Sequence, residues 1–150
     1  MEKYLTAEGL EKFKKELDYL ENTKRKEIAE RIRYTASFGD LKENAGYHEA
    51  KDSQAFMEGR ILELKHIIAT ARVVEKNSSG VVGIGSTVVL HSNDRQDEFA
   101  IVDPQEADVF SNKLSYQSPL GAKLMRKTKG DRISVQTPGG TIEYTILDVK

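Results

Sequence analysis

The feature that most constrains this chain is a short polar stretch, Phe38–His48, which separates two long runs of helix-type apolar periodicity. Gly39 interrupts the first run. Asp40 and Glu43, three positions apart, have the spacing of a capping box, so we predict that a second helix begins at Asp40. If the two helices fold back on one another, both carboxylates lie exposed at the end of a rod.

The apolar residues of both runs recur at the spacing of a coiled coil. The first run follows steps of three and four from Leu10 to Leu20 and then three steps of four, a stutter that locally relaxes supercoiling. The second run is a cleaner heptad from Tyr47 to Ala71. With Thr6 as the first cap, the pattern predicts an antiparallel helical hairpin. Arms of about 31 residues give a rod of roughly 45 Å.

The second half of the chain predicts a small sheet domain. All three prolines lie there, and we place the boundary near Asn77–Gly80, with a hairpin over 1–76, its acidic tip at 39–48, and a second domain over 80–150. Ser118 and Pro119 predict the cap and first residue of a short helix, and Thr137–Gly140 a tight hairpin turn. Four or more antiparallel strands with one helix on their face make an α+β fold. Strands are predicted at 86–91, 97–102, 131–136 and 141–149.

Composition excludes several classes of protein. The net charge of −1 argues against free double-stranded nucleic acid as the main partner, while a local basic patch is compatible with it. Without cysteine there is no disulfide or zinc–thiolate site. No apolar run approaches the roughly 20 residues of a membrane span, and no signal peptide is found, so we expect a cytoplasmic protein with no membrane partner. No nucleophile elbow or catalytic triad supports an independent enzyme.

The carboxylates of Asp40 and Glu43 allow two interpretations. A capping box requires this spacing and needs no further purpose. At the end of a rod, however, two carboxylates whose only cationic neighbour is Lys42 also offer oxygen ligands to a divalent ion. Two carboxylates do not hold Mg²⁺ firmly by themselves, so this would be half a site that a partner completes, as in two-metal phosphodiester chemistry. His48 fits a polar tip residue better than a metal ligand, because no second ligand stands at helical spacing.

Several segments resemble the Gre transcript cleavage factors of bacterial RNA polymerase. Gly39–Ala45, Tyr47–Lys51 and Gln54–Ile61 are similar to the tip and second helix of that family. The resemblance covers essentially the whole chain, and its tip motif is highly specific. Motifs of the GreA type continue in order through the second half, at Gly85–Val88, Ile101–Val102, Glu106–Asp108, Ser118–Gly121 and Thr137–Gly140.

The resemblance implies a coiled-coil hairpin followed by an FKBP-like α+β domain. In that family the second domain docks at the rim of the polymerase secondary channel and the hairpin enters it. Asp40 and Glu43 would then help to bind a Mg²⁺ shared with the polymerase, not held tightly by this chain alone, so that the polymerase cleaves backtracked RNA and arrested complexes are rescued. The chain would be a monomeric elongation factor that activates another enzyme.

The resemblance also assigns roles to residues outside the acid pair. Basic residues off the apolar stripes are often simply solvated or paired, but Arg33, Lys42 and Lys51 are candidates to face the RNA 3′ end. Polymerase docking would fall to the exposed helix start at Ser118, Pro119 and Leu120.

Two departures from the family pattern weaken the acidic charge of the tip and the basic patch that faces the RNA. Gly46 stands where an acidic residue is usual, and Ala36 where arginine is frequent. One alternative is therefore an inhibitory factor that enters the channel without promoting cleavage. A second alternative, a prolyl isomerase or chaperone-like module, has little support, because the second half lacks tryptophan and has few aromatic residues for a ligand pocket.

Overall fold

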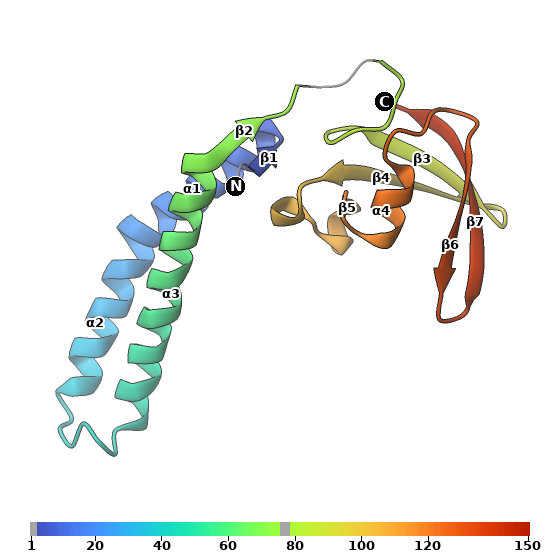
Figure 1. Ribbon diagram of the computed structural model, residues 1–150. Helices are drawn as coiled ribbons and strands as arrows, with labels where there is room; N and C mark the ends of the chain where they lie inside the picture. The colour runs from blue at the N-terminus through green and yellow to red at the C-terminus, as the bar shows by residue number, and fades with distance from the viewer. Residues whose placement is uncertain (1–2, 76–78) are drawn as a thin grey trace. The chain divides into compact units, whose positions relative to one another are not determined.

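The computed structural model describes residues 3–75 and 79–150, which form two compact units (Figure 1). The hairpin unit is Leu10–Ala71. The sheet unit comprises the described residues before Leu10 together with those from Arg72 onward. Part of the predicted boundary, Asn77 and Ser78, lies outside the described residues.

The hairpin unit contains two antiparallel helical arms, as predicted (Figure 1). The first arm is nearly continuous, and Thr6 caps it as predicted, because its Oγ1 accepts a hydrogen bond of 3.0 Å from the Gly9 amide. No helix in the described residues combines the length and the apolar character needed to cross a membrane. The elements are α1 (Ala7–Tyr19), a π-helical turn η1 (Leu20–Lys24), α2 (Arg25–Ala36) and α3 (Ala45–Thr70).

The predicted stutter coincides with the π-helical turn η1. Leu20 and Ile28 are eight residues apart, and at about 100° per residue eight steps overshoot two full turns by about 80°. The wider π-helical turn takes roughly one extra residue and so returns Ile28 toward the face that carries Leu20. Ile28 is buried against Met57 and Ile61 of α3, with Leu20 packed beside them. The π turn thus keeps both halves of the first arm packed on α3.

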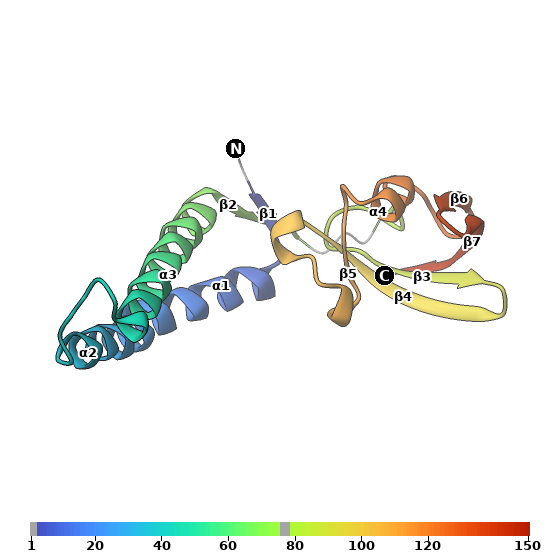
Figure 2. The same cartoon turned by 90° about the horizontal axis from the view of Figure 1, so that it is seen from below.

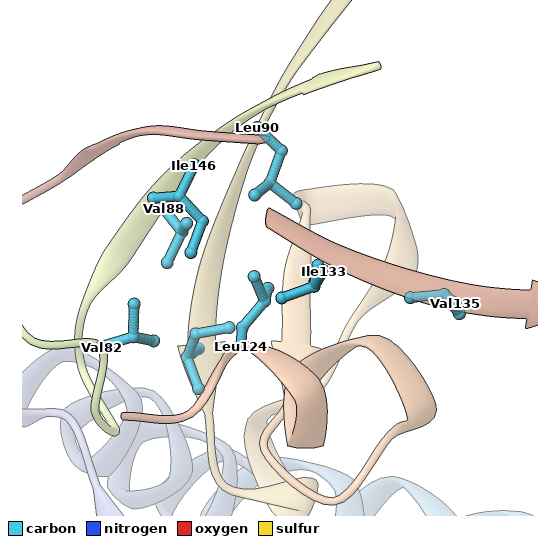
Figure 3. Close-up of a cluster of buried hydrophobic side chains, with 8 residues drawn as sticks. Val82, Val88, Leu90, Leu124, Ile133, Val135 and Ile146 are labelled. Atoms are coloured by element: carbon cyan, nitrogen blue, oxygen red, sulfur yellow. The ribbon is translucent and has the colours of Figure 1, made fainter. Parts of the chain in front are cut away.

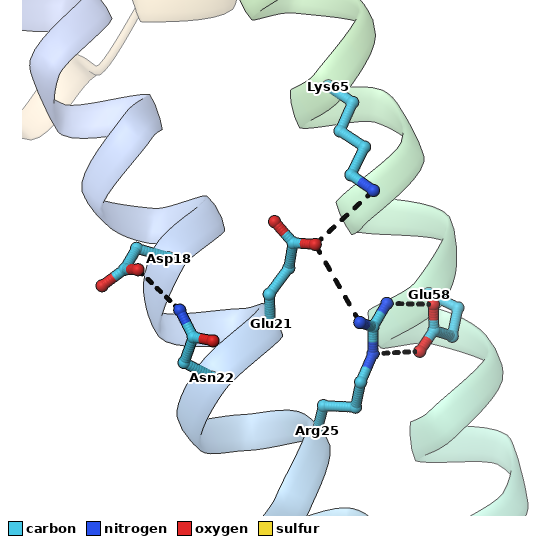
Figure 4. A network of polar contacts seen from close by, with 6 residues as sticks. All are labelled: Asp18, Glu21, Asn22, Arg25, Glu58 and Lys65. Carbon is cyan, nitrogen blue, oxygen red and sulfur yellow. Dashed lines mark hydrogen bonds and ion pairs between the residues drawn. The ribbon is translucent and has the colours of Figure 1, made fainter.

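Charged pairs connect the two arms along their length (Figure 4). Arg25 donates from Nε and Nη2 to the two oxygens of Glu58 at 2.9 and 3.0 Å, and Arg60 pairs with Glu16 in the same way at 2.8 and 2.9 Å. The hydrogen bonds from Arg25 lower the pKa of the Glu58 carboxyl. A lowered pKa means that the pair stabilises the hairpin at neutral pH and loses this effect as the pH falls through that pKa.

The sheet unit is built on five strands in the order β5-β4-β3-β7-β6. All four predicted strands are confirmed to within a few residues, and the predicted turn joins β6 to β7 with Thr137 paired to Gly140. Figure 2 shows β3 and β4 side by side as an antiparallel pair. The expectation of a purely antiparallel sheet is wrong at one edge, where β5 runs parallel to β4. The strands are β3 (Thr87–Ser92), β4 (Arg95–Val102), β5 (Lys113–Ser115), β6 (Arg132–Thr137) and β7 (Gly140–Val149).

The predicted short helix α4 (Pro119–Leu124) covers the sheet and completes its core. Ser118 caps it as predicted, accepting a hydrogen bond of 3.1 Å from the Gly121 amide. Leu124 is fully buried among strand residues such as Leu90 and Ile146 (Figure 3). The α+β class is therefore confirmed.

Several short elements of the sheet unit have no counterpart among the predictions. They include β1 (Lys3–Leu5) and β2 (Ala71–Val73), which pair with each other. The 3₁₀ turns η2 (Pro104–Glu106) and η3 (Val109–Ser111) fill the crossover between β4 and β5. Glu106 is buried and accepts hydrogen bonds from the Thr6 amide and hydroxyl at 2.8 and 2.6 Å, so it supplies the acid that a capping box at Thr6 would otherwise contain.

Candidate functional site at the hairpin tip

The second arm begins at Ala45, not at Asp40, and its N-cap is Asn44. The Asn44 side chain makes two strong contacts: Oδ1 accepts from the Tyr47 amide at 3.0 Å, and Nδ2 donates to the Thr35 carbonyl at 2.6 Å. The prediction that Asp40 starts this helix is therefore wrong. Asn44 both starts α3 and joins it to the end of α2.

The delayed start of α3 has a physical cause in the backbone at Gly39 and Asp40. Both residues have positive φ, 78° and 49°, so the chain makes a left-handed turn before it can enter a right-handed helix. The turn is closed by the Glu43 amide, which donates to the Asp40 carbonyl at 3.1 Å. His48 Nε2 lies 3.0 Å from the Lys42 carbonyl and acts as its donor. The tip is thus an ordered turn, and the capping-box interpretation of Asp40 and Glu43 is wrong.

Both acids of the tip present their side chains to solvent. Within the described part of the chain, neither the Asp40 nor the Glu43 carboxylate has a hydrogen-bond or ion-pair partner. Carboxylate oxygens are the ligands that Mg²⁺ prefers. The described residues contain no cluster of three or more acidic or histidine side chains placed to hold a metal. The oxygens of Asp40 and Glu43 are therefore accessible, and a metal site here would need further ligands from outside the described residues.

The basic residues of the hairpin divide into paired and unpaired sets. Arg25 and Arg60 bind acids of the opposite arm, and Arg31 lies 3.6 Å from Glu49 of α3. The predicted RNA-facing residues are exposed and have no ion-pair partner in the described residues: Arg33, Lys42 and Lys51. These three cations are therefore accessible to a partner.

The predicted docking residues differ in their exposure. Ser118 is engaged by its own turn, because its Oγ donates to the Ser115 carbonyl at 2.7 Å and accepts from Gly121. Pro119 is exposed, whereas Leu120 is partly buried against the sheet core. The expectation that all of the helix start is exposed is therefore wrong for Leu120.

Gly46 is the second residue of α3, nearer to the helix start than the predicted start at Asp40 would place it. A Cβ placed on it would lie 3.4 Å from Thr35 Cγ2 and 3.6 Å from Asn44 Oδ1, so a methyl group fits. We expect Gly46→Ala to raise the free energy of unfolding by about 0.5 kcal/mol through lower backbone entropy. Gly46→Glu is expected to add about 0.3 kcal/mol more, because a carboxylate then lies in the first turn of the helix.

Thermal unfolding of Gly46→Ala and Gly46→Glu followed by circular dichroism at low salt measures both effects, and added salt should remove only the increment specific to glutamate. A lower melting temperature for Gly46→Ala would instead show that close approach of α3 to Thr35 requires glycine.

Comparison with known proteins gives consistent matches along the whole chain. Residues 3–73 match the family model for the N-terminal part of GreA/GreB transcription elongation factors, and residues 77–150 match the model for the C-terminal part. Transcription elongation factor GreA of Clostridium acetobutylicum is 44% identical over 150 residues, covering 97% of this chain and 95% of the relative. GreA of Shouchella clausii is 45% identical, covering 98% and 96%. Among solved structures, GreA factor homolog 1 (Gfh1) of Thermus thermophilus is 28% identical, with coverage of 100% and 99% and a TM-score of 0.47.

Proposed function

Because the chain belongs to the GreA/GreB family of transcription elongation factors, we propose that it enters the secondary channel of bacterial RNA polymerase and stimulates cleavage of backtracked RNA. The observation that carries this proposal is the pair of exposed carboxylates, Asp40 and Glu43, presented by an ordered turn at the end of a helical hairpin. Such a pair is suited to complete a site that lies inside another protein.

The dimensions of the hairpin support its use as a probe of a narrow channel. The 26 residues of α3 extend for about 39 Å at 1.5 Å per residue. Two packed helices are only about 20 Å across. The charge pairs between the arms and the buried residues Ile28, Met57 and Ile61 hold the two arms together. In this proposal the arms carry the tip to its target, and only the tip takes part in RNA cleavage.

In this proposal Asp40 and Glu43 hold a Mg²⁺ ion jointly with the polymerase. The ion, when bound, supplies an activated water and balances the negative charge of the phosphodiester. Asn44 and His48 keep the tip turn closed, so that the backbone that carries the two acids is already in place when the hairpin arrives. Lys42, between the acids in sequence, offers a charge to an RNA phosphate. The reacting centre belongs to the polymerase, and the chain alone is expected to cleave no RNA.

The direct test is RNA cleavage by a purified bacterial polymerase halted in a backtracked complex, with and without the protein. Shortening of the RNA from its 3′ end at a higher rate is the expected result. If the protein instead slows both cleavage and nucleotide addition, it is an inhibitory channel factor. Isomerisation of a proline peptide, measured in parallel, is expected to show no acceleration.

Docking is expected to depend on Pro119, the exposed first residue of α4. Pro119→Glu should weaken polymerase binding by about tenfold without disturbing the fold, because glutamate is well tolerated at a helix start and the change alters only the surface. Pro138→Glu, which places the same charge at an exposed turn of the same unit, is the matched control. Affinities from a pull-down titration measure the effect. Equal binding by Pro119→Glu and the parent would place the docking surface elsewhere.

A further inference from the structure

Two aromatic rings stand in solvent beside the tip acids. Tyr34 is 67% exposed and Phe38 is 69% exposed. Their ring centroids are 5.1 Å apart and their planes are at 88°, an edge-to-face contact. In such a contact the edge of one ring covers part of one face of the other, and the high exposure of both rings leaves the remaining faces open. Contiguous exposed apolar patches often mark interaction sites.

The ring pair is continuous with the proposed site. Phe38 is separated from Asp40 only by Gly39, so their Cα atoms are at most about 7.6 Å apart. Arg31 precedes Tyr34 by three residues and therefore lies on the same helical face. The two rings, and through Tyr34 the guanidinium of Arg31, therefore adjoin the segment that carries the acids.

The cation on this face can change partners. Arg31 is 3.6 Å from Glu49, and both side chains are largely exposed, at 52% and 72%. Exposed ion pairs of this kind contribute little, so an incoming phosphate can replace Glu49 at small cost. Open ring faces beside a cation are the usual means by which proteins bind single-stranded nucleic acid, with bases on the rings and phosphates on the cation.

We propose that the Tyr34–Phe38 pair is a stacking surface for an unpaired nucleobase of the RNA strand that meets Asp40 and Glu43, with Arg31 binding a neighbouring phosphate. This inference rests on the proposed function and deepens it, because it adds a contact with an RNA base to the phosphate contact proposed for Lys42. The contact is independent of sequence, since every base has an aromatic face.

The test pairs a change in the protein with a change in the RNA. Tyr34→Leu/Phe38→Leu keeps apolar, helix-compatible side chains but removes the rings, and Tyr34→Phe/Phe38→Tyr keeps both rings as the matched control. Halted complexes carry either adenine or an abasic site at the unpaired RNA 3′ nucleotide. Cleavage is measured in single turnover at saturating factor. Comparing the effect of losing the base with and without the rings gives the interaction energy between ring and base.

Loss of the base should slow cleavage with the parent by about tenfold, the scale of one stacking contact. The leucine variant should be about tenfold slower on intact RNA and show no further loss on abasic RNA, while the ring-swapped control behaves like the parent. An equal loss on abasic RNA for parent and leucine variant would overturn the proposal. So would a leucine variant that only binds polymerase more weakly, because the rings would then contact protein.

A second readout does not depend on cleavage. With 2-aminopurine at the unpaired RNA 3′ nucleotide, the parent should quench its fluorescence on binding, and the leucine variant should not. Quenching without cleavage would leave the stacking inference standing and remove the proposed stimulation of cleavage. Equal fluorescence with parent and leucine variant would remove the stacking inference alone.

Discussion

Asp40→Asn is expected to reduce stimulated RNA cleavage by on the order of a hundredfold while leaving binding to polymerase unchanged. Asparagine has the same shape as aspartate and is one of the few residues that accept the positive φ of 49° found at position 40. The substitution therefore removes only a charge and an oxygen ligand. Glu43→Gln should act in the same direction.

A second variant at the same position separates backbone effects from charge. Asp40→Gly removes the carboxylate and relaxes the left-handed backbone, so it should lose cleavage as Asp40→Asn does. Asp40→Ala is a poorer test, because alanine in that conformation costs about 1 kcal/mol and disturbs the turn itself. Cleavage rates at several Mg²⁺ concentrations, with polymerase affinity measured in parallel, distinguish these cases. Full activity of Asp40→Asn would show that Asp40 serves the turn and not the metal.

Gly121→Ala is expected to destabilise the sheet unit by about 3 kcal/mol. Gly121 is buried in α4, and an added Cβ would collide with the backbone carbonyl oxygen of Ser115. This atom has little freedom to move, because the Ser115 carbonyl also accepts hydrogen bonds from the amide and hydroxyl of Ser118. The collision therefore displaces α4 from the core that Leu124 completes.

Gly59→Ala is the matched control, because the same substitution is expected to raise stability there. Gly59 lies in the middle of α3 with no atom near the position of an added Cβ, so alanine should stabilise the hairpin by about 0.5 kcal/mol. Amide hydrogen exchange reports the two units separately, with faster exchange expected in β3 and β7 for Gly121→Ala only. Unchanged protection of those strands would show that the Ser115 turn adapts to the larger residue.

The long elements could be predicted from the sequence because their patterns repeat many times. The heptads of the hairpin and the β-branched runs of β3, β4, β6 and β7 each give several independent indications of the same structure. Three-residue elements such as β1 and β5 contain too few residues to show a period. The parallel pairing of β5 with β4 depends on a crossover that no local pattern specifies.

The helix start at the tip was predicted incorrectly for a definable reason. The spacing of Asp40 and Glu43 satisfies a capping box, but spacing carries no information about backbone φ angles. Gly39 and Asp40 both have positive φ, and the helix therefore starts later in the sequence. Asn44 offered a competing signal, since asparagine is among the best N-caps. The exposure of both acids, which matters more for the proposed function, is expected whether the helix starts at Asp40 or at Ala45.

Contacts between distant residues account for what else the sequence did not reveal. Glu106 accepts a hydrogen bond from the Thr6 amide although the two residues are 100 positions apart. Leu120 is partly buried by core residues that come from other parts of the sequence. Tyr34 and Phe38 are four residues apart, as expected for one helical face, but only the structure shows that both rings are largely exposed. The roles of Arg33, Lys42 and Lys51 stay predictions.

The closure of the tip turn has a consequence for how such a protein can change over time. The hydrogen bonds of Asn44 and His48 all end on residues between Thr35 and His48, so the shape of the tip is set without help from the rest of the arms. Insertion of whole helical turns into both arms would lengthen the hairpin and leave the turn intact. Mutations in the turn would alter chemistry without altering length. Reach and the proposed chemistry are therefore separately evolvable, and the tip is expected to keep its shape when it is grafted onto another antiparallel helical hairpin.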